Sequence, residues 1–476
     1  MDLRLLPRVV VENRVTYLVA RFRADLKSRL NKSKDNDKTI PLEYKIGEDF
    51  AKKLDKEDPL AGYKKRFYIP ERETLDIDGG TKSAKPIIYM DGNSLGLASK
   101  NVEDEMKAEF ERWKNLTTRR SGVDKKAAEY QAKLVGAETE EVIVTGGASV
   151  NLHALVSTFY KPKGKRTKII GDELNFSSDI YALAGQIRLK GRDPEKNLVI
   201  VKSRDGRTIS EEDIIAVMSD EVSICHLPSV YFVSGQLLDM KRLTKAAHDH
   251  GIIIGYDCCH SIGVIPHRLH EWGVDYALWC NYKYMNGSTG AIAGLYIHRK
   301  HFNETPGLPT WWGNSPSNRF DFKAEWTPTG NAASWHLGSN LSIGFGVSPV
   351  FASSKMIVDA GLDRIREKSL KATGYMMYLI DELLSKKPYN YSVGNPREPE
   401  RRGGHVAVEH DEARRISEAL TARGVLPDFR PPRTIRLSPI PLYTTYQEVW
   451  DVVQHLKAVI DNKEYQKYDL NKKEVY

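Results

Sequence analysis

The sequence has few cysteines and no long apolar run, and each of these lacks excludes a class of protein. Only 4 of its 476 residues are Cys. Two of them, Cys258 and Cys259, are adjacent and none lies in a CxxC pair, which excludes a disulfide framework and a zinc ligand set. No apolar stretch approaches the ~20 residues of a membrane span. We therefore expect a globular protein of a reducing, cytoplasmic compartment without a membrane partner.

The composition is that of a folded protein with a positive charge of +8. A basic balance can indicate nucleic acid, an anionic membrane surface or an anionic substrate. Much of the excess lies in the first ~38 residues, and not in a motif with interleaved aromatic residues, so we expect no nucleic-acid partner. An Arg-rich start can be an organellar presequence, but Asp2, Glu12 and Asp25 interrupt the acid-poor pattern of such segments. Residues 1–40 are predicted to be a basic N-terminal extension.

From about residue 100 the chain alternates apolar, strand-like runs with helix-like segments. This order predicts a mainly parallel sheet of the seven-stranded type with helices on both faces, which is an α/β fold. Later the order changes to a long helical stretch over 353–385, a strand, a helix and a last strand, which predicts a smaller α+β domain. The expected strands are Glu141–Thr145, Thr167–Gly171, Asn197–Lys202, Ile224–Phe232, Gly251–Asp257, Tyr276–Cys280, Ile292–His298, His405–Glu409 and Thr434–Ser438.

The helix starts and the domain boundaries can also be predicted. Ser210 precedes three acidic residues and should cap a helix, and Ser177 or Ser178 should cap another. The predicted domains are the extension, an N-terminal part of the small domain (41–98), a large cofactor domain (99–345) and a C-terminal small domain (346–476).

Residues that follow the strands carry the chemistry, because ligands of such sheets bind beyond the carboxyl ends of the strands. Gly146-Gly147-Ala148-Ser149 lies between a strand and a helix, where backbone N–H groups favour a phosphate. This signal alone is weak, since no GxGxxG or P-loop motif accompanies it. Asp257 ends a strand and His260 follows it, although a carboxylate at that position is also a common helix cap.

Lys283 gives these residues a common interpretation. It follows an apolar strand in the run Trp279-Cys-Asn-Tyr-Lys-Tyr-Met-Asn-Gly287, and a lone Lys there would ordinarily be a surface residue. A strand-end Asp257 followed 26 positions later (283 minus 257) by a strand-end Lys is the order of a pyridoxal 5'-phosphate (PLP) site. The amine forms a Schiff base with the cofactor aldehyde, and the carboxylate keeps the pyridine nitrogen protonated. The sequence therefore predicts a PLP enzyme.

Over residues 45–460 the sequence resembles the kynureninase family, which consists of PLP enzymes of the aspartate-aminotransferase fold type I. The stretches that carry the resemblance are Met90-Asp-Gly-Asn-Ser-Leu-Gly-Leu97, Asn175-Phe-Ser-Ser-Asp-Ile-Tyr181, His270-Glu-Trp-Gly-Val-Asp275, Asn281-Tyr-Lys-Tyr-Met-Asn-Gly287, Gly290-Ala-Ile-Ala-Gly294 and Ile435-Arg-Leu-Ser-Pro-Ile-Pro-Leu-Tyr443. Fold type I in general shares only the Asp and Lys pattern, whereas the first and last stretches are typical of this family.

The resemblance implies a role for each matching position. The catalytic residues would be Lys283, Tyr282 and Asp257. The cofactor contacts would be Ala148, Ser149, Phe176, Ser177, Ser178, Asp179, Asp257, His260, Tyr282 and Lys283, and the neighbouring subunit would supply Trp311 and Ser339 to the phosphate. Arg436 would bind the substrate α-carboxylate, a bidentate task that suits a planar guanidinium. Asn93 and Ser94 would lie at the substrate end of the cleft.

The implied reaction is hydrolytic Cβ–Cγ cleavage of L-kynurenine or its 3-hydroxy form to anthranilate or 3-hydroxyanthranilate and L-alanine. This is a step of tryptophan catabolism, carried out by a homodimer with shared active sites. Lys283 would move the Cα proton, and Tyr282 with the cofactor phosphate would relay a proton when water adds to the side-chain ketone.

Three departures from the family pattern concern the aryl end of the substrate. The segment 113–124 lacks the His and Trp of typical members, Ser339-Asn-Leu341 replaces their usual pattern, and Pro228 falls near a family Ser. The choice between the two substrates is therefore open.

Two alternatives also remain. Another fold type I enzyme, a desulfurase or an aminotransferase, would need a reactive Cys on a loop or a second carboxylate-binding Arg. A non-catalytic basic or regulatory protein would not need Lys283.

Overall fold

The computed structural model describes residues 43–72, 86–116, 122–338 and 344–469. Contacts divide the chain into two compact units, Met1–Lys45 and Ile46–Tyr476, and the description below concerns the second. The predicted extension over residues 1–40 lies outside the described residues. No helix within the described ranges is both long and apolar enough to cross a membrane.

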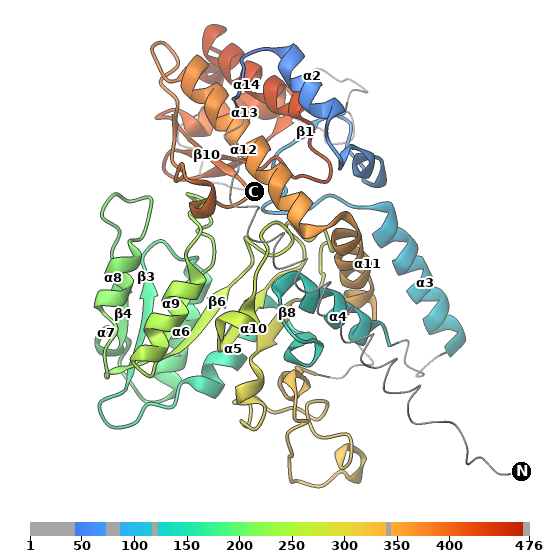
Figure 1. Ribbon diagram of the computed structural model, residues 1–476, viewed down its shortest axis with the longest axis vertical. Coiled ribbons are helices and arrows are strands. Elements are labelled where there is room, and N and C mark those ends of the chain that lie inside the picture. Colours follow the sequence, from blue (N-terminus) through green and yellow to red (C-terminus); the bar gives the residue numbers. More distant parts are fainter. Residues whose placement is uncertain (1–42, 73–85, 117–121, 339–343, 470–476) are drawn as a thin grey trace, which may run out of the picture. The chain divides into compact units, whose positions relative to one another are not determined.

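A seven-stranded sheet forms the centre of the large lobe (Figure 1). Six strands run in the same direction, and β8 alone is antiparallel to both of its neighbours. The expected mainly parallel α/β fold is confirmed. In spatial order the strands are β2 (Val142–Val144), β8 (Gly294–Ile297), β7 (Tyr276–Trp279), β6 (Ile253–Asp257), β5 (Val222–Pro228), β3 (Lys168–Asp172) and β4 (Leu198–Val201).

Helices cover both faces of this sheet because successive strand residues point to opposite sides. Cys225 of β5 packs in the apolar cluster that contains Leu243 of α9, whereas its neighbour Ile224 packs in the cluster that contains Leu155 of α5 and Leu183 of α6. β5 is buried along its whole length, as expected for a strand covered on both faces. The helices of this lobe are α3 (Lys100–Leu116), α4 (Val123–Val135), α5 (Ala148–Phe159), α6 (Ser177–Leu189), α7 (Pro194–Asn197), α8 (Glu211–Ala216), α9 (Met240–Asp249) and α10 (Leu269–Trp272).

The C-terminal part forms a four-stranded antiparallel sheet that helices cover (Figure 1). Its order is β12 (Asp428–Arg430), β13 (Thr434–Leu437), β10 (Val406–Glu409) and β9 (Ser392–Val393). Its helices are α12 (Leu362–Leu384), α13 (Ala413–Ala422) and α14 (Tyr446–Asp461), whereas α11 (Gly344–Ala360) packs against α3 and α4 of the large lobe.

The segment before residue 98 contacts this C-terminal part. β1 (Ile88–Tyr89) pairs with β11 (Val425–Leu426), and Asp55 of α2 (Glu48–Lys56) accepts a hydrogen bond from the Tyr446 backbone N–H at 2.7 Å. The exact domain boundaries stay predictions.

Three local expectations are wrong, and each has a physical reason. Neither Ser177 nor Ser178 caps α6, because the helix begins at Ser177 and Phe176 is the N-cap without a side-chain hydrogen bond. The expected strand over 224–232 ends at Pro228, because its last part forms a turn. The long helical stretch is two helices, because Gly361 has a φ of 86° that interrupts the helical backbone. By contrast, Ser210 caps α8 as predicted.

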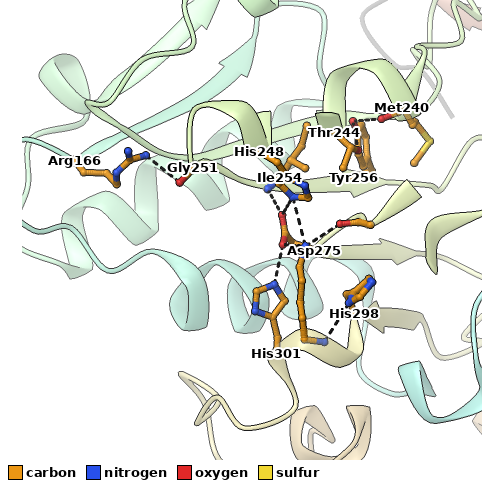
Figure 2. A network of polar contacts seen from close by, with 12 residues as sticks. Arg166, Met240, Thr244, His248, Gly251, Ile254, Tyr256, Asp275, His298 and His301 are labelled. Carbon is orange, nitrogen blue, oxygen red and sulfur yellow. Dashed lines mark hydrogen bonds and ion pairs between the residues drawn. The ribbon is translucent and has the colours of Figure 1, made fainter. Parts of the chain in front are cut away.

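A buried carboxylate lies at the amino end of β7, on the edge of the sheet away from the strand-end residues of interest (Figure 2). Asp275 contacts His248 at 2.9 Å, His301 at 2.8 Å and Lys300 at 2.6 Å, and it accepts the Ile254 backbone N–H at 2.8 Å. Burial alone would raise the pKa of Asp275, but hydrogen bonds from the two His side chains outweigh burial and hold that pKa below its ordinary value. This cluster ties β6, β7 and the segment after β8 together.

Candidate active site at the carboxyl ends of the strands

Lys283 lies in the loop after β7, and its amine meets a buried imidazole. The distance between Lys283 Nζ and His260 Nε2 is 2.9 Å, and the same amine lies 5.9 Å from the centre of the Tyr282 ring. Burial, and then the positive charge of Lys283, lower the pKa of His260 well below its ordinary value. A neutral imidazole can accept a hydrogen bond from the amine, and this contact fixes the direction of the Lys283 side chain.

Asp257 is the last residue of β6 and supplies a half-buried carboxylate beside this amine. Burial, and then the negative charge of Asp179, raise the pKa of Asp257 to about 6, while Lys283 acts in the opposite direction. Its Oδ1 accepts the backbone N–H of Cys259 at 2.6 Å, which forms a turn and not the start of a helix. Oδ1 is thus fixed by the backbone. The pair of carboxylates is suited to hold a protonated nitrogen between the strands and α6.

The N-terminus of α5 can bind an anion. Gly147 is its N-cap and no side chain bonds to the free N–H groups of the first turn, which contains Ala148 and Ser149. Gly146 has a φ of 57°, a left-handed conformation that lets the chain turn sharply from β2 into the helix. The hydroxyls of Ser149 and Ser178 are 2.7 Å apart, so the starts of α5 and α6 meet.

Phe176 stands at the start of α6 with its side chain 48% exposed. Its ring centre is 5.4 Å from that of Phe232 in an edge-on arrangement, and Phe232 lies 6.4 Å from the His260 ring. Ser177 and Asp179 follow in the first turn of α6. An exposed aromatic face is therefore linked through Phe232 to His260, the partner of the Lys283 amine, and a flat ring could stack on it.

Arg436 reaches the same region from β13 of the small sheet. Its Nη1 donates to the Phe232 carbonyl and its Nη2 to the Ser94 hydroxyl, both at 2.7 Å. With the Asn93 amide oriented so that its oxygen faces the guanidinium, that oxygen accepts from Nε and from Nη1, each at 3.3 Å. Burial lowers the pKa of Arg436 to about 10, so the group stays positive at neutral pH. Asn93, Ser94 and Arg436 are thus brought together as one polar cluster.

The structure does not bring two predicted residues to this cluster. Trp311 donates its Nε1–H to the Arg319 carbonyl at 2.9 Å and packs against Phe320 and Phe322. Ser339 lies outside the described residues, as does part of the segment 113–124. The neighbouring subunit was expected to supply both residues to the phosphate, so their predicted roles stay predictions. Pro228, the third departure, pairs in register with Asp257.

Sequence reasoning missed two buried residues next to this site. Asp428 forms an ion pair with Arg436 and also accepts from Ser94 at 3.2 Å. His226 lies in the middle of β5, with its Nε2 3.5 Å from Oδ2 of Asp179. Asp428 begins a short strand and His226 stands inside an apolar one, so neither position has the strand-end placement that pointed to Asp257 and Lys283.

Comparison of the sequence with known proteins finds proteins named kynureninase. A family model described as "Kynureninase C-terminal domain" matches residues 365–456. Proteins named kynureninase are 49% identical in Geobacillus thermodenitrificans and 47% identical in Bacillus thuringiensis, each over 440 residues that cover 90% of this chain and 97% of the relative. A kynureninase of Shouchella clausii is 45% identical, and the alignment covers 88% of this chain and 96% of that protein.

Solved structures with the same fold are more distant in sequence. A cysteine desulfurase from Thermococcus onnurineus has a TM-score of 0.67 at 18% identity and covers 83% of this chain and 100% of that chain. A mutant of C-DES with glycine covalently linked to its PLP cofactor has a TM-score of 0.65 at 13% identity, over 81% of this chain and 99% of that chain. At these identities the likeness shows the fold alone, which agrees with the expected fold type I.

Proposed function

The chain belongs to the kynureninase family, and on this basis we propose that it cleaves the Cβ–Cγ bond of L-kynurenine, of 3-hydroxy-L-kynurenine or of both by hydrolysis. The products would be anthranilate or 3-hydroxyanthranilate and L-alanine. The observation that carries the proposal is the meeting of Lys283 with His260 and Asp257 at the carboxyl edge of the sheet, opposite the buried guanidinium of Arg436.

The polar groups of this region fit PLP. The uncapped N-terminus of α5, together with the Ser149 and Ser178 hydroxyls, suits a phosphate. The half-buried Asp257 carboxylate suits a protonated pyridine nitrogen, and the exposed Phe176 ring suits a flat ring face. When bound, PLP supplies an aldehyde for the amino group and a ring that withdraws electrons from the substrate Cα. Ala148, Ser177 and Asp179 complete the proposed contacts within one chain.

Each step of the proposed reaction has a residue of this chain. Arg436, with Ser94 and Asn93 beside it, binds the α-carboxylate and orients the amino acid. Lys283 Nζ takes the proton from the substrate Cα and returns it later, and His260 keeps this amine in place. Asp257 holds the proton at the ring nitrogen.

Tyr282 is the proposed donor when water adds to the side-chain ketone. The neighbouring Cys280, and then burial, raise the pKa of Tyr282 above its ordinary value, so its phenol remains protonated and available as a donor.

The remaining features of the proposal concern assembly and location. Trp311 is 42% exposed, and Phe320 and Phe322 beside it are 62% and 77% exposed. We propose that a second copy of the chain covers such aromatic surface in a homodimer, in which Trp311 and Ser339 reach the phosphate of the other subunit. The four Cys are all buried and free, which suits a reducing cytoplasm. Sedimentation of the PLP-loaded protein tests the dimer, and a monomer at micromolar concentration would contradict it.

A desulfurase activity has little support in the residues. Such an enzyme needs a reactive thiolate on an accessible loop. All four Cys are buried, and burial raises the pKa of the Cys225 thiol and raises that of Cys258 to about 12. Burial also acts on Cys280, but its hydrogen bond with Cys259 and the positive charge of Lys283 together outweigh burial and lower its pKa to about 7. This thiol lies buried directly after β7 and not on an accessible loop.

Two measurements test the proposed function. Purified protein titrated with PLP should gain an absorbance band in the visible range, and Lys283→Ala should lose that band. Turnover of kynurenine and of 3-hydroxykynurenine, followed by the fluorescence of the anthranilate product, tests the reaction and resolves the open substrate choice. A protein that shows no band with PLP overturns the cofactor assignment, and a protein that turns over neither compound overturns the substrate.

A further inference from the structure

His226 is a buried imidazole in the centre of the large sheet, and the proposed function gives it no role. It is the fifth residue of β5 (Val222–Pro228), and its side chain has no exposed surface. Within the described part of the chain neither of its ring nitrogens makes a hydrogen bond. A buried polar group without a partner costs free energy, so such a group inside an apolar strand needs an explanation.

The orientation of this ring depends on a glycine in the neighbouring strand β6, which leaves room for an aromatic ring beside it. In register, His226 of β5 pairs with Gly255 of β6, and Gly255 pairs with Tyr276 of β7, so the three residues form one row on the same face. A Cβ on Gly255 would lie 2.0 Å from the Tyr276 ring. The Tyr276 ring thus occupies the space above Gly255 and stacks on the His226 ring, with centres 5.8 Å apart and planes at 8°.

The edge of the His226 ring points toward α6, which covers this face of the sheet. His226 Nε2 lies 3.5 Å from Oδ2 of Asp179, and this oxygen is itself buried and has no hydrogen-bond partner among the described residues. A ring nitrogen and a carboxylate oxygen, both without another partner among the described residues, therefore face each other. The stack on Tyr276 fixes the plane of the ring.

Asp179 connects His226 to the site. Pro228, two residues after His226, pairs in register with Asp257, so His226 and Asp257 lie on the same face of adjacent strands. Asp179 is close enough to Asp257 that its negative charge, after burial, is the largest influence that raises the pKa of Asp257. Asp179 of α6 is thus close to both His226 of β5 and Asp257 of β6.

We infer that His226 is a positioning residue of the site for the ring nitrogen: its Nε2–H donates to Asp179 and holds this second carboxyl group beside Asp257. The inference rests on the proposed PLP site. Two adjacent carboxylates repel each other, and a hydrogen-bond donor on one of them offsets this repulsion. A second carboxylate held at this position favours a protonated ring nitrogen. His226 touches neither the cofactor nor the substrate in this arrangement.

The experiment compares two substitutions of His226 in the PLP-loaded protein. His226→Phe keeps a flat ring for the stack and removes the donor, whereas His226→Gln keeps an N–H group near the position of Nε2. We expect the PLP dissociation constant of the Phe variant to rise about tenfold or more, because a hydrogen bond to a charged group is lost. The Gln variant should stay within about threefold of the unchanged protein. Ile224→Val, on the same strand and face, is the control for a small change in packing.

A second readout separates positioning from mere packing. PLP labelled with 15N in its ring reports by NMR whether the ring nitrogen carries a proton. We expect the protonated chemical shift in the unchanged protein and in the Gln variant, and a shift toward the unprotonated value in the Phe variant. A Phe variant with the same PLP affinity and the same 15N shift as the unchanged protein overturns the role of His226 and leaves the PLP site intact.

The inference stays testable if the Phe variant does not fold. In protein labelled with 15N at histidine, and with the signal assigned from the Gln variant, Nε2 of His226 should show the shift of a protonated nitrogen. An unprotonated Nε2 overturns the inference. Failure of the unchanged protein to bind PLP is the different result that overturns the proposed function itself.

Discussion

The guanidinium of Arg436 is ion-paired with Asp428, which is its partner in register on the adjacent strand β12. Both side chains are almost completely buried, at 1% and 2% exposure. The same carboxylate also accepts from Arg430 at 3.1 Å. A substrate carboxylate that binds Arg436 therefore joins an existing ion pair, and it adds negative charge to a group that already has a partner.

Asp428→Asn should make the protein less stable and more dependent on a carboxylate ligand. Loss of the charge leaves the Arg436 cation buried without compensation, which costs about 3 kcal/mol or more. Saturating L-alanine, the proposed product, carries an α-carboxylate that can replace the lost charge. We expect alanine to raise the melting temperature of the PLP-loaded variant more than that of the unchanged protein. Asp411→Asn, at an 89% exposed side chain, is the control; an equal rise in both proteins would contradict the compensation.

Arg436→Lys should weaken substrate binding more than it slows turnover. Lys keeps the positive charge but loses the planar fork that contacts the Phe232 carbonyl and the Ser94 hydroxyl and that can hold a carboxylate through two hydrogen bonds. We expect KM to rise about ten- to hundredfold, with a smaller change in kcat. Arg433→Lys, at a half-exposed side chain that pairs with Asp411, should leave both constants unchanged. An unaltered KM for Arg436→Lys speaks against a carboxylate site here.

Gly96→Ala should disturb the loop that carries Lys283. A Cβ on Gly96 would lie 2.4 Å from the Lys283 carbonyl oxygen and equally close to the Asn286 side-chain oxygen, and the Gly96 N–H donates to the Tyr282 carbonyl at 2.6 Å. We expect the free energy of unfolding to fall by about 1–3 kcal/mol, and PLP to bind more weakly because the loop must shift. Urea unfolding and PLP titration measure the two effects. Gly62→Ala, where nothing lies within 4 Å of the new Cβ, is the matched control.

Asp275→Asn should lower stability at neutral pH and reduce its loss in acid. The folded-state pKa of Asp275 is depressed, so its contribution to stability is fully present above the unfolded value of 3.8 and is lost as the pH falls below that value. Removal of this buried partner of His248, His301 and Lys300 should cost about 3–5 kcal/mol at pH 7.

Urea unfolding at pH 7 and at pH 2.5 measures both effects of the Asp275 change. Asp249→Asn, at an exposed ion pair with Lys245, should cost less than about 1 kcal/mol. If the variant and the unchanged protein lost the same stability between the two pH values, Asp275 would not be the titrating group.

The sequence was sufficient for the large sheet and for the residues at its edge. Apolar, strand-like runs alternate with helix-like segments, and this pattern can be seen in the sequence itself. Asp257 and Lys283 stand out because each is a charged residue at or shortly after the end of an apolar strand. The start of α6 was misjudged because serine is a good N-cap in general, whereas here the chain enters the helix from Phe176.

His226 and Asp428 were not predictable, because their roles depend on contacts between distant parts of the chain. Asp428 is far in sequence from Ser94 and meets it only because the segment before residue 98 packs against the C-terminal part, and His226 meets Asp179 only because α6 folds onto β5. Contacts between residues that are distant in sequence cannot be predicted from local sequence patterns. The two departures from the family pattern over 113–124 and at Ser339 stay predictions, since part of that segment and Ser339 itself lie outside the described residues.

The short strand β7 has a further consequence for protein engineering. Asp275 precedes its first residue and Lys283 lies in the loop after its last, so the carboxylate with the lowered pKa and the amine of the candidate site lie at opposite ends of one strand. Substitutions around Asp275 can therefore change the acid sensitivity of the fold while the loop that carries Lys283 keeps its sequence. A variant library aimed at acid stability is best confined to the amino edge of the sheet.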